Sequence, residues 1–267
     1  MTTFFGAALA VSVCSGLFTS CWGAFKDAPY EKFSHTSFWR SVLFAVLIFA
    51  VWWAIPTLRA RVQQLSLFQI FFLNMGIERI AIEIYKPCFR TEDQSKYLIP
   101  QDMSFGGVHV GSPIARPAIG IVLIAATIGL MLVGTAIESY PVHLIVAVLT
   151  GVFICIGGAG KDAPFEGFQI KKFFRSAIVL AVMSPVFYVL GPTPLGLLIF
   201  MYGGLERILV ESYKTYFTPF KPGKFLPDSP VIDEEFVRQR EPIRIVALVI
   251  VLGAGTLYAN ALYMKFG

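Results

Sequence analysis

Long apolar stretches alternate with short charged segments along this chain of 267 residues. The apolar stretches are continuous runs rich in Leu, Ile, Val, Ala and Phe, and they lack the alternating polarity of membrane β-barrel strands. Most of them approach the roughly 20 residues with which a helix crosses a bilayer. We therefore predict eight membrane helices, or seven because several stretches are short or charged, near 3–25, 41–57, 65–84, 117–137, 141–160, 176–192, 195–213 and 243–263.

The charged segments occur twice, which indicates an internal duplication. KDAPYEKF at 26–33 returns as KDAPFEGF at 161–168, an offset of 135 residues, and GIERI at 76–80 returns as GLERI at 204–208, an offset of 128. Each copy then holds four predicted helices, and an even number gives both copies the same orientation in the membrane. We predict an all-α polytopic bundle, a single membrane domain of two parallel four-helix repeats, at about 3–137 and 141–264.

Pro29 and Pro164 mark the place where we expect one helix of each copy to end. A proline disfavours helical geometry at the residue before it, so Ala28 and Ala163 should be extended. The stretch at 3–25 resembles a secretory signal in length only, because its counterpart at 141–160 lies inside the chain. We expect it to be a retained helix.

Composition supports a membrane location. Hydrophobic residues make up 56% of the chain and charged residues only 15%, with a mean hydropathy of +0.69. These values exclude an ordinary soluble domain. The net charge of +5 arises in segments that flank the predicted helices, which favours an anionic lipid over nucleic acid as the partner.

Seventeen of the 22 Lys and Arg residues lie in four segments, 26–40, 86–116, 161–175 and 214–244. In an eight-helix arrangement these segments share one side of the membrane. The positive-inside rule would make that side cytoplasmic, but cations that form a binding site need not follow the rule.

Ionisable residues within predicted helices are the strongest chemical signal. Such a group costs at least about 2.5 to 3.5 kcal/mol near the bilayer centre, so it marks a functional-site candidate. In each copy Arg, Glu and Lys follow one another at helical spacing along one stripe, as Arg79, Glu83 and Lys86 do in the first copy. Guanidinium suits phosphate or carboxylate binding. Alternatively, the acids neutralise the arginines and lock the two copies together.

Four segments resemble motifs of the prolipoprotein diacylglyceryl transferase family, in the family's order from about residue 38 onward. The segment 194–211, PLGLLIFMYGGLERILVE, is similar to the late helix in which an essential arginine follows Tyr-Gly and precedes Val-Glu. GAGK at 158–161 falls where the family has its Gly-Arg signature. MSFGG at 103–107 resembles its Met-Ser-Phe-His-Gly-Gly element, and 79–85 falls at its Arg-Ile-Gly-Tyr helix.

The chain also departs from the family pattern. Lys161 stands where the signature arginine is expected, and the signature asparagines are missing from 162–165. The 103–107 element lacks its histidine, for which His109 is the nearest substitute. Only Arg207 carries over directly, which leaves a different lipid-modifying reaction, or loss of catalysis, open.

The resemblance implies a transferase of the bacterial cytoplasmic membrane that moves the diacylglyceryl group of phosphatidylglycerol to a cysteine thiol. Its expected partners are membrane lipids and a protein substrate or partner subunit, with no cofactor and no metal. The expected catalytic residues are Arg207, Lys161, Glu206, Glu166 and His109. Expected substrate-binding residues are Arg79, Glu78, Lys26, Arg175, Lys214 and Glu211.

Two other functions fit the same residues. A transporter or lipid carrier could use the paired Glu and Arg residues as a central site between the repeats. A non-catalytic subunit of a membrane complex could use them for packing. Because the second copy carries the closer family match, we expect one working site centred there and walled by the first copy.

Overall fold

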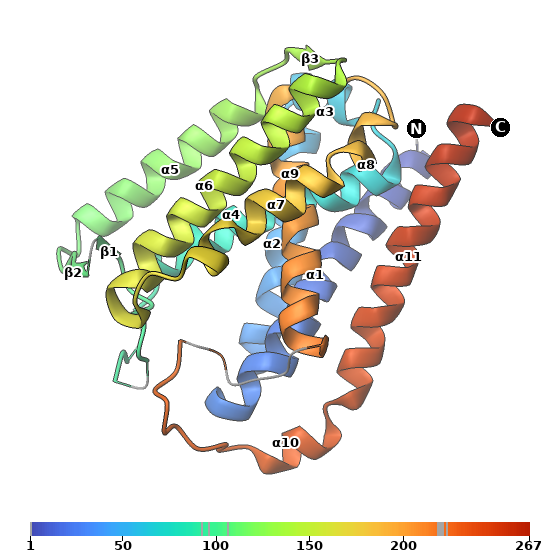
Figure 1. Cartoon of the computed structure of the whole chain (residues 1–267). Coiled ribbons are helices and arrows are strands. Elements are labelled where there is room, and N and C mark those ends of the chain that lie inside the picture. Colours follow the sequence, from blue (N-terminus) through green and yellow to red (C-terminus); the bar gives the residue numbers. More distant parts are fainter. Residues whose placement is uncertain (1, 92, 96, 106, 218–221, 223) are drawn as a thin grey trace.

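The computed structural model describes residues 2–91, 93–95, 97–105, 107–217, 222 and 224–267 (Figure 1). It is mostly helical. The helices are α1 (Thr2–Glu31), α2 (His35–Ala54), α3 (Pro56–Val62), α4 (Leu67–Phe89), α5 (Ala115–Met131), α6 (Tyr140–Glu166), α7 (Ile170–Met183), α8 (Pro185–Tyr188), α9 (Leu195–Ser212), the π-helix η1 (Tyr213–Phe217), α10 (Glu234–Gln239) and α11 (Glu241–Phe266). Two short antiparallel pairs join β1 (Ser104–Phe105) to β2 (Val108–His109), and β3 (Ala136–Ile137) to β4 (Thr193–Pro194).

Four of the described helices are long and apolar enough to cross a membrane: α1, α2, α6 and α11. Helix α5 is apolar as well but shorter. These helices confirm the prediction of a helical membrane protein. The number of membrane crossings stays a prediction, because α4 and α9 carry the charged stripes and are largely buried among the other helices.

Helices α4 and α9 pack against each other at the centre of the bundle (Figure 1). The Ser66 hydroxyl accepts from the Gln69 backbone N–H, and the Ser66 backbone N–H donates to the Gln69 side-chain oxygen; this capping box fixes where α4 begins. A Cβ atom on Gly76 of α4 would collide with the backbone carbonyl of Phe200, and one on Gly204 of α9 with that of Phe72. These two equivalent glycines therefore let the helix backbones touch.

The hairpins on either side of this pair also make matching contacts. Helix α1 packs on α2, and α6 packs on α7. Gly16 of α1 lies against the backbone of Ser41, and Gly151 of α6 lies against the backbone of Ser176. Gly151 and Ser176 stand 135 residues after Gly16 and Ser41. Positions that recur in the sequence thus make the same kind of contact.

The predicted helix ends at the two prolines are wrong. Helix α1 continues through Pro29 to Glu31, and α6 continues through Pro164 to Glu166, so Ala28 and Ala163 are helical. Each proline lies in the last turn and lacks the N–H that would bond the carbonyl four residues earlier. For Pro29 that carbonyl, on Phe25, accepts from Arg240 at 2.9 Å instead. The Pro29 carbonyl accepts a hydrogen bond from the Ile232 backbone at 2.9 Å, so packing with a distant loop supports the extra turn.

The predicted helix at 176–192 is also corrected. Helix α7 starts earlier, at Ile170, and ends at Met183, and the short α8 follows from Pro185. Proline at the first position of α8 cannot donate the hydrogen bond that would continue α7. The chain therefore bends at Ser184.

We predict that Gly204→Ala destabilises the protein. The new methyl group would meet the Phe72 carbonyl oxygen, and overpacking of this kind costs about 1 to 3 kcal/mol. Gly203→Ala is the matched control, because a Cβ there meets nothing within 4 Å. Thermal unfolding in detergent should show a lower melting temperature for Gly204→Ala only. Equal melting temperatures for the two variants would contradict the close helix crossing.

Candidate functional site

The four charged segments of the sequence meet around one cavity of about 710 Å³. We call it the charged cavity. Among the described residues, its lining includes eleven Lys and Arg and six Asp and Glu side chains, drawn from 19–41, 82–101, 161–175 and 207–224. Half of the chain's 22 Lys and Arg residues are therefore gathered here, and the cavity has a surplus of positive charge.

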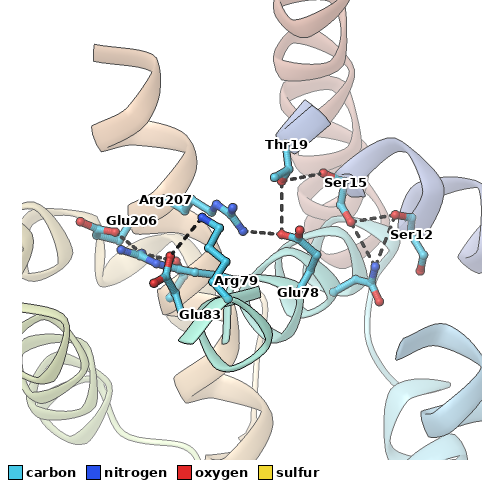
Figure 2. Close-up of polar contacts among 11 residues, drawn as sticks. Ser12, Ser15, Thr19, Glu78, Arg79, Glu83, Glu206 and Arg207 are labelled. Carbon is cyan, nitrogen blue, oxygen red and sulfur yellow. Dashed lines mark hydrogen bonds and ion pairs between the residues drawn. The ribbon is translucent and has the colours of Figure 1, made fainter. Parts of the chain in front are cut away.

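Two ion pairs lie between α4 and α9 on the inner side of this cavity (Figure 2). Arg207 pairs with Glu78, and Arg79 pairs with Glu206, so each copy supplies one acid and one base. Glu78 is fully buried and Glu206 is 2% exposed. The pairing offsets the cost of burying these charges in a low-dielectric environment.

Hydroxyl groups add a hydrogen bond to each of the two buried acids. Thr19 of α1 donates to Glu78 at 3.4 Å, and Ser176 of α7 donates to Glu206. Arg207 also lies 5.7 Å from the ring centre of Trp22. The inner ion pairs are thus held by the helices that surround α4 and α9.

A second layer of ion pairs lies closer to the cavity mouth. Glu83 is 4.0 Å from Lys86 and 3.9 Å from Lys161, whereas Glu211 is 3.1 Å from Lys214 and 3.7 Å from Lys26. Each acid therefore binds the lysine three residues further along its own copy and a lysine from the other copy. The stripe predicted from helical spacing is present, but most of the ion pairs made by its Arg and Glu side chains run between copies.

The outer rim is built differently in the two copies. In the first copy, Asp27 and Glu31 pair with Lys224 of the second copy, at 3.0 Å and 2.7 Å. Burial disfavours the charge on Lys224, but these two carboxylates outweigh that cost and raise its pKa above the ordinary value. In the second copy, Lys172 pairs with both Asp162 and Glu166.

Sequence reasoning missed Lys224, although a further repeat marks it. KYL at 96–98 returns as KFL at 224–226, again at an offset of 128. Tyr97 and Phe225 pair as an antiparallel bridge, and the Leu98 backbone donates to the Lys224 carbonyl at 2.8 Å. The two repeated loops therefore contact each other, and both contribute residues to the lining of the cavity.

A second hollow, of about 930 Å³, joins the charged cavity on the side of α6 and α7. We call it the apolar groove, since α5, α6 and α9 give it mainly apolar walls. Both hollows share Glu83, Lys161, Asp162, Gln169, Lys172, Arg175, Glu211 and Lys214. The charged residues at this junction thus border an apolar compartment.

Most predicted site residues meet at these two hollows. The charged cavity is lined by Lys26, Lys161, Glu166, Arg175, Arg207, Glu211 and Lys214, and the groove by Arg79 and Glu206 as well. Glu78 lines neither and lies behind Arg207. Arg175 has no carboxylate partner among the described residues, and its buried Nε has no hydrogen-bond partner.

The structure does not bring His109 to this site. His109 lies on the exposed strand β2 and does not line either hollow. Gly106 of the same predicted motif lies outside the described residues. Within the described part of the chain, no three His, Cys, Asp or Glu side chains are grouped to hold a metal ion.

Comparison of the chain with family models, with curated proteins and with solved structures finds no match. The chemistry of the site is therefore inferred from its geometry. Clustered ammonium and guanidinium groups beside an apolar compartment suit a ligand with an anionic head and a hydrocarbon part.

We predict that Arg207→Met destabilises the fold by about 3 to 5 kcal/mol, because it leaves Glu78 buried without its countercharge. The double variant Glu78→Gln, Arg207→Met removes both charges and should recover most of that loss. Melting temperatures in detergent measure both effects. If the double variant were as unstable as Arg207→Met alone, the ion pair would not be the cause.

Proposed function

We propose that this protein binds an anionic phospholipid, with the phosphate in the charged cavity and hydrocarbon in the apolar groove, and transfers part of that lipid to an acceptor. The observation that carries the proposal is the junction of the two hollows. Lys161, Arg175 and Lys214 line both the charged cavity and the groove. A lipid phosphate there would meet several cations, while the hydrocarbon part of the same lipid stays out of water in the groove.

We also propose that the site is built by two parallel four-helix repeats in the bacterial cytoplasmic membrane. The matching contacts of Gly76 with Gly204, and of Glu78–Arg207 with Arg79–Glu206, support this arrangement. Each acid pairs with a base from the other copy, as a duplicated interface requires.

The transfer step is supported by the resemblance to prolipoprotein diacylglyceryl transferases. In that chemistry a thiolate sulfur attacks the diacylglyceryl carbon bonded to the phosphate oxygen. The new bond is sulfur–carbon, the carbon–oxygen bond breaks, and glycerol phosphate leaves with the electron pair. Arg207, Lys161 and Arg175 would stabilise the leaving phosphate.

A base must accept the thiol proton in this reaction. Glu166 and Glu206 border the hollows, but each already accepts from a cation, Lys172 and Arg79 respectively. Each carboxylate is thus already engaged by a cation and is not free to meet a thiol. Binding is therefore better supported by the geometry than proton transfer, and the two are tested separately.

We predict that Arg175→Gln weakens anionic lipid binding by about tenfold, the loss of about 1.4 kcal/mol expected for one charge-assisted hydrogen bond. Arg175 has no carboxylate partner among the described residues, so its replacement leaves no described acid without its countercharge. Lys171→Gln is the control, because Lys171 belongs to the same helix but lines neither hollow. Native mass spectrometry of the purified protein with phosphatidylglycerol measures retention. Equal loss in both variants would argue against the site.

We predict that the wild-type protein transfers a diacylglyceryl group from phosphatidylglycerol to a cysteine-containing lipoprotein peptide. Lys161→Ala should reduce the transfer rate by about 100-fold or more, because it removes one donor that stabilises the leaving phosphate. Mass spectrometry of the peptide detects the added group. Lys171→Ala should keep the wild-type rate. Lipid binding without any transfer by the wild type would reject the transferase and leave a lipid carrier or a non-catalytic subunit.

A further inference from the structure

We infer that the lipid-tail site is present at only one of two equivalent interfaces between the copies: the hydrocarbon chain of the ligand enters sideways between α5 and α6, and the equivalent entrance beside α11 and α1 is closed by aromatic side chains. This inference rests on the proposed binding of an anionic phospholipid. It adds where the tail lies, which helices it contacts and why a duplicated protein has one tail site.

The second copy has a wide opening where α6 reaches the charged cavity. Residues 157–160 read Gly-Gly-Ala-Gly, and Gly157, Gly158 and Ala159 line the apolar groove. A Cβ atom built on Gly157, Gly158 or Gly160 would meet nothing within 4 Å. These glycines border open space, in contrast to Gly76 and Gly204, which are needed for close packing.

The first copy places bulky residues at the equivalent positions. Residues 22–25 read Trp-Gly-Ala-Phe. At the repeat offset of 135, Trp22 is equivalent to Gly157 and Phe25 is equivalent to Gly160. The Lys26 ammonium lies 4.4 Å from the Trp22 ring centre. Phe25 is 7% exposed, and the Arg240 guanidinium carbon lies 4.2 Å from its ring centre.

The last helix of each copy strengthens this difference. Helix α11 runs beside α1 and packs on it, whereas α5 packs mainly on α4 (Figure 1). Arg240, just before α11, also donates to the Phe25 carbonyl at 2.9 Å. The interface of α11 with α1 is therefore closed, whereas the equivalent interface of α5 with α6 holds the groove.

The groove of the second copy opens toward the surface that would face lipid. Leu123 of α5 and Phe153 of α6 line it and are 41% and 72% exposed. Lys161 and Arg175 stand at its inner end. A lipid therefore enters the groove laterally from the bilayer without crossing water. Its hydrocarbon chain then lies between these apolar residues, and its phosphate reaches the cations.

The test uses phosphatidylglycerol with a photoactivatable diazirine in one acyl chain, added to the full-length protein in phosphatidylcholine nanodiscs. We expect crosslinked peptides from α5 and α6. Gly157→Trp, which gives the second copy the residue found at position 22, should lower crosslinking by about tenfold or more, a change of at least about 1.4 kcal/mol in binding. Gly253→Trp on α11 is the matched control, because a Cβ there also meets nothing within 4 Å.

A second variant keeps the test decisive if Gly157→Trp folds poorly. Ala126→Trp narrows the groove from α5 and should lower crosslinking in the same way. Crosslinks mainly in α1 or α11, or crosslinking unchanged in a folded groove variant, would overturn the inference.

Binding of glycerol 3-phosphate, measured by calorimetry, separates this inference from the proposed function. The tail-free compound should bind wild type and Gly157→Trp equally well, which would support both the head-group site and a separate tail site. If it binds and crosslinking is insensitive to the groove variants, only the tail site is wrong. If neither compound binds the wild type, both proposals are wrong.

Discussion

The structure depends on the reciprocal ion pairs at the crossing of α4 and α9. An ionised side chain inside a membrane protein needs a countercharge at short range, since lipid offers none. Gly76 and Gly204 bring the two backbones into contact, so that Glu78 reaches Arg207 and Arg79 reaches Glu206. Larger residues at either glycine would separate the helices and leave these charges buried without partners.

This pairing also determines what is left for a ligand. The innermost acids are neutralised within the protein, and Glu83 and Glu211 each form ion pairs with two lysines. The remaining surplus of cations faces one cavity, where Arg175 has no carboxylate partner among the described residues. A symmetrical duplication thus provides the charge, while the differences at 22–25 and 157–160 give one side of the cavity an apolar extension.

Much of this arrangement could be predicted from local patterns. Apolar run length identified the long helices, and the repeated segments identified several of the charged residues that line the cavity, although not Lys224. The predicted ends at Pro29 and Pro164 were wrong because a local preference before proline was outweighed by packing of the last helical turn. His109 was placed by motif order alone, and it lies on an exposed strand instead.

The sequence by itself determined that this is a helical membrane protein with two related copies of a charged motif, because run length, composition and repetition are properties of the chain. Only the tertiary structure decided which charges pair, since Glu78 and Arg207 are 129 residues apart and meet through the contact of α4 with α9. It also decided that Gly157 borders an open groove, whereas Gly204 lies in close contact with the backbone of α4. A residue's neighbours depend on how helices pack, and helical spacing alone specifies only the face on which it lies.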